Sequence, residues 1–143
     1  MDLHLQGKKA IVTGGTKGIG LAIAQTLASE GCDIAVCARD ATLVDKTVAD
    51  LSAKGVQAHG ASADVTDGDS FRHWIRQAAG QLGGLDILVA NVSALAGAPD
   101  EAAWRAGLET DVLGTVRAVE AGLPFLEKSD CGSIVAIAST AAL

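Results

Sequence analysis

The sequence predicts an α/β fold in which a doubly wound parallel sheet carries helices on both faces. Two observations support this fold class. Short apolar runs alternate with longer stretches of helical periodicity along the whole chain, and a glycine-rich segment lies where the first strand gives way to the first helix. The chain has 143 residues, 49% of them hydrophobic, which is the size of one domain spanning residues 1–143.

Five apolar runs are predicted as strands, at residues 10–12, 34–36, 56–62, 85–90 and 133–138. The run at 56–62 is the weakest of them. The run at 85–90 is continuously apolar rather than alternating, which is typical of a strand that helices cover on both faces. We therefore expect residues 85–90 to be deeply buried.

Four stretches with apolar residues at helical spacing are predicted as helices, at residues 19–27, 44–51, 71–82 and 108–119. Glycine closes the first three, at Gly31, Gly55 and Gly83–Gly84. Asp67 or Asp69 is placed to cap the third helix. A loop of small residues through Pro99 leads to the fourth, and Pro124 helps to end it.

The elements follow the order βαβαβαβαβ, which favours right-handed crossovers between parallel strands. Residues 134–137 are too apolar for a bare sheet edge, because unpaired backbone at an edge promotes aggregation. We therefore expect that the sheet is truncated after the fifth strand and that a covering segment is missing.

Charge and cysteine content limit the classes of function. The net charge is −6 and the isoelectric point is about 4.8, so the chain lacks the basic surface that nucleic acids require. No apolar run approaches membrane-spanning length, and the N-terminus does not resemble a signal peptide. The three cysteines and three histidines form no ligand-spaced cluster. We expect a soluble, cytoplasmic protein without a metal site.

The segment Thr13–Gly20, TGGTKGIG, lies at the turn from the first strand to the first helix, where the ligand site of a parallel sheet begins. Gly14, Gly18 and Gly20 allow a tight turn, a close approach of the backbone to a pyrophosphate, and close packing of helix and strand. The amides at the start of the helix would then face the anion. In this position the glycines predict a dinucleotide site rather than a simple turn.

The segment TGGTKGIG resembles the fingerprint of the short-chain dehydrogenase/reductase family, and the resemblance covers the whole chain. It implies a Rossmann-like fold. Asp64–Val65 resembles the pair that holds the adenine ring, and Asn91 matches the second asparagine of the family's Asn-Asn-Ala-Gly segment. Three neighbours of Asn91 depart from that segment, Ala90, Val92 and Ser93. By themselves, Asp64 would be a loop carboxylate and Asn91 a turn residue.

The end of the second strand indicates which nicotinamide cofactor is bound. An acidic residue there would bind the ribose hydroxyls of NAD, but Arg39 offers a planar fork suited to the 2′-phosphate of NADP. Lys17 adds a second cation, and Asp40 could divert the guanidinium. NADP (NADPH) is therefore predicted, with NAD the less favoured cofactor. The predicted cofactor-binding residues are Gly14, Thr16, Lys17, Gly18, Ile19, Gly20, Arg39, Asp64, Val65 and Asn91.

The resemblance also implies the chemistry. Family members transfer a hydride between the nicotinamide and a carbonyl or secondary alcohol, using a tyrosine, a lysine, a serine and an asparagine. The match places Ser139 in the serine position and Asp111 in the asparagine position, where aspartate loses the amide donors. Each also has a plain structural reading, as a turn residue and a helix-surface carboxylate. The sequence has no tyrosine and no lysine after Lys128, so the Tyr-x-x-x-Lys part is expected beyond Leu143.

Two functions are compatible with these residues. The first is an NADP-dependent oxidoreductase of which this chain is the N-terminal portion, inactive by itself. The second is a non-catalytic NADP-binding sensor or regulatory relative, which Asp111 and the altered segment after residue 90 favour. The substrate would be a small carbonyl compound or alcohol, and the resemblance implies a homo-oligomer, a dimer or tetramer, at full length.

Overall fold

A computed structural model describes residues 2–139. Along the chain these residues form β1 (Lys9–Thr13), α1 (Gly18–Ser29), β2 (Asp33–Ala38), α2 (Ala41–Ser52), β3 (Ala58–Ser62), α3 (Gly68–Leu82), β4 (Ile87–Ala90), α4 (Glu101–Gly107), the π-helix η1 (Leu108–Val112), α5 (Leu113–Leu126) and β5 (Ser133–Ala136). All five predicted strands are present, and β3, β4 and β5 are shorter than predicted.

The five strands form one parallel sheet in the order β3-β2-β1-β4-β5. Starting from β1, the next two strands, β2 and β3, are added on one side of it. The chain then crosses back, and β4 and β5 are added on the other side of β1. The direction of building reverses between β1 and β4, which is where a doubly wound sheet opens a crevice for ligands. The predicted Rossmann-like, doubly wound fold is confirmed.

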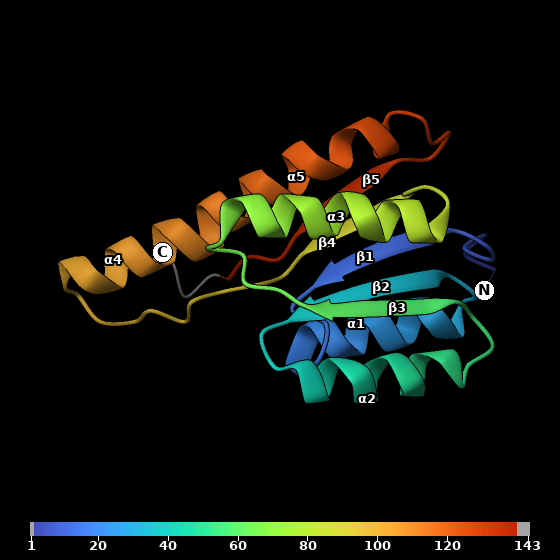
Figure 1. Cartoon of the computed structure of the whole chain (residues 1–143), viewed down its shortest axis with the longest axis horizontal. Coiled ribbons are helices and arrows are strands. Elements are labelled where there is room, and N and C mark those ends of the chain that lie inside the picture. Colours follow the sequence, from blue (N-terminus) through green and yellow to red (C-terminus); the bar gives the residue numbers. More distant parts are fainter. Residues whose placement is uncertain (1, 140–143) are drawn as a thin grey trace.

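Helices cover both faces of the sheet, with α3 and α5 on one face and α1 and α2 on the other (Figure 1). Successive strand residues point to opposite faces. Ile11, Ala35 and Leu88 lie in register and join the core beneath α3 and α5. Val12 joins the core on the other face. Because β4 is flanked by β1 and β5 and is covered by α5, its last three residues are buried, as predicted.

The region before α5 differs from the prediction. A helix begins at Glu101, not near residue 108, and it continues through the π-helix into α5. Asp100 caps this helix by accepting a hydrogen bond from the Ala103 N–H at 2.8 Å. Residues 101–107 contain no buried side chain, so α4 rests on local capping and leaves no apolar periodicity in the sequence.

Pro124 lies inside the last turn of α5 and does not end it, which corrects a second expectation. A proline removes its own N–H from the helical ladder and crowds the carbonyl four residues earlier. The helix nevertheless continues for two residues beyond Pro124, to Leu126.

The strand β5 forms one edge of the sheet and is exposed along its length. Its apolar side chains Ile134 and Val135 are 43% and 44% exposed. No helix among residues 2–139 combines the length and the apolar character needed to cross a membrane.

The N-terminus of α3 distinguishes the two predicted capping residues. The carboxylate of Asp67 accepts a hydrogen bond from the Ser70 N–H at 3.3 Å, whereas Asp69 lies in the first turn, fully exposed, 3.9 Å from Arg72. Asp67→Ala is expected to lower the free energy of unfolding by about 1 kcal/mol. Asp69→Ala is expected to lower it by less, because solvent screens this exposed charge. Urea unfolding of both variants tests this, and a larger loss for Asp69→Ala would contradict the assignment of the cap.

Candidate functional site

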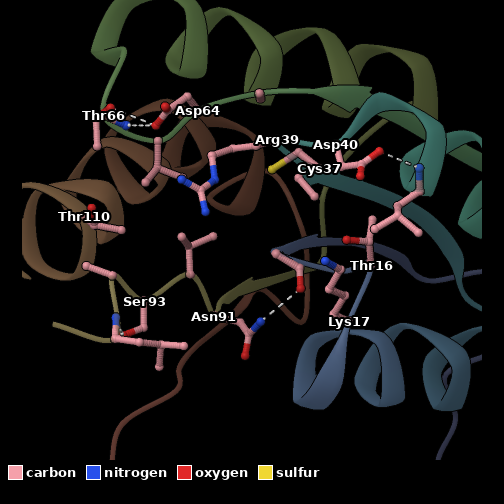
Figure 2. Close-up of a pocket in the computed structure, with 18 of the residues that line it drawn as sticks. Thr16, Lys17, Cys37, Arg39, Asp40, Asp64, Thr66, Asn91, Ser93 and Thr110 are labelled. Carbon is pink, nitrogen blue, oxygen red and sulfur yellow. Dashed lines mark hydrogen bonds between the residues drawn. The ribbon is translucent and has the colours of Figure 1, made fainter. Parts of the chain in front are cut away.

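A cavity of about 680 Å³ opens at the carboxyl ends of the strands, beside the boundary between β1 and β4 where the strand order reverses. The glycine turn after β1, the end of β2 with the start of α2, the turn after β3 and the segment after β4 line it, and Ala106 of α4 and Thr110 of the π-helix complete the lining (Figure 2). Seven of the predicted cofactor residues line this cavity, Gly14, Thr16, Lys17, Arg39, Asp64, Val65 and Asn91.

Gly18 and Gly20 do not line the cavity, and they shape the turn for different reasons. Gly18 begins α1 with a φ of +52° and has open space where a side chain would be, so the conformation is what favours glycine. Gly20 has an ordinary φ but no space, because a Cβ would collide with the carbonyl oxygen of Gly14 and the amide of Asn91. Ile19, between them, is 63% exposed.

Asn91 fastens the glycine turn to the end of β4. Its side-chain amide donates to the carbonyl oxygens of Thr13 and Gly14, both at 3.2 Å. Its main-chain N–H donates to the Thr13 hydroxyl at 3.0 Å, and that hydroxyl donates to the Val89 carbonyl at 3.3 Å. Asn91 therefore holds the turn in place in addition to lining the cavity.

The start of α1 differs from the starts of α2, α3 and α4. Those three helices are each capped by an aspartate that accepts a main-chain hydrogen bond. At the N-cap of α1 stands Lys17, and among residues 2–139 no side-chain capping bond is made there. The first N–H groups of α1 are thus open to an anionic ligand.

Arg39 follows β2 and points its guanidinium into the cavity (Figure 2). The Ser62 hydroxyl fixes its main chain by donating to the Arg39 carbonyl at 2.8 Å. The neighbouring Asp40 does not divert the guanidinium, because its carboxylate caps α2 through the Leu43 N–H at 3.1 Å. In the part of the chain that the structure describes, neither Arg39 nor Lys17 forms an ion pair.

Asp64 forms a tight turn with Thr66 on the β3 side of the cavity. One carboxylate oxygen, Oδ1, accepts hydrogen bonds from the Thr66 N–H at 2.9 Å and from its hydroxyl at 2.8 Å. These two bonds, followed by the charge of Arg39, hold the pKa of Asp64 below its ordinary value. Asp64 is therefore ionised at neutral pH and serves as a hydrogen-bond acceptor.

Cys37 also lines the cavity, at the end of β2. It is almost fully buried, and burial raises the pKa of its thiol to about 12. The thiol stays neutral at physiological pH, so Cys37 acts as a small apolar side chain and not as a nucleophile.

Arg117, on α5, is a site residue that the sequence analysis missed. Its guanidinium donates to the Val65 carbonyl at 2.9 Å and pairs with the Glu109 carboxylate at 2.5 Å. The side chain is only 14% exposed. Arg117 thereby joins the turn after β3 to the π-helix. Its Val65 partner is 52 residues away in the sequence, so no local pattern identifies it.

The two predicted catalytic residues lie outside the cavity lining. Asp111 sits in the π-helix, and its carboxylate accepts hydrogen bonds from the Ser93 hydroxyl at 2.8 Å and the Ala94 N–H at 2.7 Å. Ser139 follows β5 as an exposed residue at the end of the described chain. Residues 2–139 hold no group of three or more His, Cys, Asp or Glu side chains that could bind a metal ion.

A parallel sheet with a ligand cavity at its reversal point and an uncapped glycine turn defines the class of dinucleotide-binding α/β domains. The family model described as short chain dehydrogenase matches residues 8–143. The chain therefore belongs to the short-chain dehydrogenase/reductase family, and the resemblance drawn from the glycine turn is confirmed.

Known proteins support the same conclusion. The chain is 32% identical over 136 residues to isoepoxydon dehydrogenase of Penicillium expansum, covering 92% of this chain and 52% of that protein. It is 35% identical over 144 residues to dehydrogenase/reductase SDR family member 4 of Sus scrofa, covering 96% and 51%. The chain thus spans about half the length of the curated relatives it matches.

Two solved structures are also similar. A short chain dehydrogenase from Burkholderia cenocepacia, solved in complex with NADP, has a TM-score of 0.86 and 35% identity, covering 96% of this chain and 58% of that one. A 7α-hydroxysteroid dehydrogenase, solved with NADH and 7-oxo glycochenodeoxycholic acid, has a TM-score of 0.91 and 32% identity, covering 99% and 56%.

The packing at Gly20 can be tested with an alanine substitution. Gly20→Ala would force α1 away from Gly14 and Asn91, and we expect it to lower the free energy of unfolding by about 1–3 kcal/mol. Gly80→Ala is the matched control, because Gly80 also lies in a helix but has open space around it. The control is expected to stabilise the protein by about 0.5–1 kcal/mol. If urea unfolding gave the two variants the same change in the free energy of unfolding, the close packing of α1 against Gly14 and Asn91 would not contribute to stability.

The part-buried pair of Arg117 and Glu109 gives a second test. Arg117→Met leaves the Val65 carbonyl and the Glu109 carboxylate without their donor, and we expect a loss of about 2–3 kcal/mol in the free energy of unfolding. Arg72→Met breaks a more exposed pair with Glu120 and is expected to cost less than about 1 kcal/mol. Chemical unfolding of both variants measures the difference, and similar losses would argue against a special role for Arg117.

Proposed function

We propose that this chain is the cofactor-binding part of an NADP-dependent oxidoreductase, which transfers a hydride between NADP(H) and a small carbonyl compound or secondary alcohol. The observation that carries the proposal is Arg39, which points into the cavity at the end of β2 without an ion-pair partner among residues 2–139. A guanidinium there suits the 2′-phosphate that distinguishes NADP from NAD. The proposal is also supported by a similar structure solved with NADP.

Named residues of the cavity suit three parts of the dinucleotide. The open N-terminus of α1, after Thr16 and Lys17, suits the pyrophosphate. Arg39 suits the 2′-phosphate, and Lys17 supplies a second positive charge near it. Asp64 and the amide of Val65 would hold the adenine ring, and the Arg117 contact with the Val65 carbonyl keeps that turn in position.

We propose that Ser139 donates a hydrogen bond to the substrate oxygen, because it follows β5 at the carboxyl end of a strand. When bound, NADP(H) supplies or accepts the hydride, and the protein supplies the polar groups around the reacting oxygen. This sequence contains no tyrosine. We therefore propose that the chain alone binds nucleotide without catalysis, and that the whole protein completes the site with a Tyr-x-x-x-Lys motif beyond Leu143.

A non-catalytic NADP-binding sensor is the second candidate function. It is favoured by Asp111 and Ser93, which depart from the family pattern and contact each other. The coding sequence beyond Leu143 separates the two functions. A Tyr-x-x-x-Lys motif there supports the enzyme, and its absence supports the sensor.

We propose that the full-length protein is a cytoplasmic homo-oligomer. The three free thiols fit a reducing compartment. The surface of α4, the π-helix and α5 exposes a row of large apolar side chains, which favours association with a second copy, at Trp104, Leu108, Val112, Val116 and Leu123.

The cofactor preference predicts the effect of removing Arg39. Arg39→Ala should weaken NADPH binding by about tenfold to a hundredfold, because a charge-assisted hydrogen bond is lost. NADH binding should change by less than about twofold, because NADH has no 2′-phosphate. Titration calorimetry with both nucleotides measures these changes.

Lys54→Ala controls for the loss of one positive charge. Lys54 lies beyond the end of α2 and is not part of the cavity lining. Its removal should leave both affinities unchanged. An unaltered NADPH preference in Arg39→Ala would remove Arg39 from the site, and no binding of either nucleotide to the unmodified chain would overturn the proposed function.

A further inference from the structure

The segment after β4 is held by one aspartate. Residues 91–97 form neither helix nor strand, yet Ser93, Ala94 and Leu95 line the cavity. Asp111 accepts hydrogen bonds from both Ser93 and Ala94, one on each carboxylate oxygen. The Ser93 hydroxyl also accepts a hydrogen bond from the Leu95 N–H at 3.1 Å. We call this set of three hydrogen bonds the Asp111 latch.

The latch restrains a conformation that the segment would not prefer by itself. Leu95 has a φ of +50° and is 89% exposed. A side chain with a Cβ is unfavourable in this left-handed conformation, so surrounding contacts must maintain it. The N–H of Leu95 is bonded to Ser93, and Ser93 is bonded to Asp111. The backbone conformation at the cavity wall therefore depends on the carboxylate.

The anchor side of the latch is firmly placed. Asp111 belongs to the π-helix, which runs directly into α5, and its carbonyl accepts a hydrogen bond from the Thr115 hydroxyl at 2.8 Å. Each carboxylate oxygen of Asp111 receives one donor from the segment, Oδ2 from Ser93 and Oδ1 from Ala94. The segment is therefore held at two points by one side chain.

The position of the latch identifies the part of the ligand that it would affect. In the proposed function, Arg39 and Asp64 place the adenosine half of NADP over β2 and β3. The remaining half then lies across the pyrophosphate, on the side of β4, where Ser93 and Asn91 stand opposite Asp64 (Figure 2). This wall is therefore the one that the nicotinamide half would meet.

We propose that Asp111 is a positioning residue that, through Ser93, pre-forms the nicotinamide-side wall of the cavity. This inference rests on the proposed function. A preformed wall favours binding because the ligand does not have to order the segment. Loss of the latch should then weaken binding of a complete dinucleotide and spare a ligand that occupies only the adenosine side.

Two ligands test this separation in the full chain. NADPH reaches both halves of the cavity, whereas adenosine 2′,5′-bisphosphate lacks the nicotinamide half. Asp111→Ala is expected to weaken NADPH binding about fivefold to thirtyfold, as for one or two lost hydrogen bonds, and to leave bisphosphate binding within about twofold. Asp111→Asn keeps an acceptor for the Ala94 N–H and should restore most of the NADPH affinity.

Ser93→Ala tests the same wall if Asp111→Ala does not fold. It removes the hydroxyl from an exposed segment and keeps the Ala94 bond, so NADPH binding should weaken by about fivefold. Amide hydrogen exchange supplies an independent measurement, because Leu95 should exchange faster in this variant. Asp69→Ala removes one negative charge outside the cavity lining and should change neither ligand's affinity.

The outcomes distinguish this inference from the proposed function. The role of Asp111 would be overturned if Asp111→Ala weakened the binding of both ligands equally or left NADPH binding unchanged. It would also be overturned if the amide exchange rate of Leu95 did not change in Ser93→Ala. If the unmodified chain binds neither ligand, the proposed function fails and the inference falls with it.

Discussion

The close contact between the first turn of α1 and the ends of β1 and β4 sets the geometry of the cavity. Gly20 has no side chain, so the helix approaches until the Gly14 carbonyl and the Asn91 amide fill the space beside it. Asn91 completes the contact by bonding to two carbonyls of the turn that lie 77 and 78 residues earlier. A larger residue at position 20 would displace the helix whose N-terminus faces the ligand. The geometry at the start of α1, where the pyrophosphate is proposed to bind, therefore depends on packing as much as on the flexibility of glycine.

Two further parts of the cavity, the turn after β3 and the segment after β4, are supported from one short helical segment. Glu109 reaches Arg117, which supports the turn after β3, and Asp111 reaches the segment after β4. Glu109 and Asp111 are only two residues apart in the π-helix, yet they bond to different parts of the structure. The π-helix thus presents one acidic side chain to each end of the cavity. π-helical turns are often found at functional sites, and this one supports two walls at once.

Much of the fold follows from local patterns in the sequence, and much of the site does not. The five strands and the glycine turn could be predicted, as could the place of Arg39 in the cavity lining, because apolar period, turn chemistry and charge are all visible locally. The helix α4 was missed because it buries no side chain. Arg117 was missed because its carbonyl partner lies 52 residues away. Asp111 was noticed as a departure from the family pattern, but its bond to Ser93 depends on how the π-helix packs beside the segment after β4.

The chain carries a net charge of −6, yet the ligand proposed for its cavity is polyanionic. The bonding of the nearby aspartates resolves this conflict. Asp40, Asp64 and Asp111 each accept a main-chain N–H bond, and the negative charge of Asp40 is also favourable at the N-terminus of α2. Among residues 2–139, neither Lys17 nor Arg39 forms an ion pair with an acidic side chain. The anionic groups are held by backbone donors while the cations stay unpaired, an arrangement that is compatible with the phosphate groups of the proposed cofactor despite the acidic surface around the cavity.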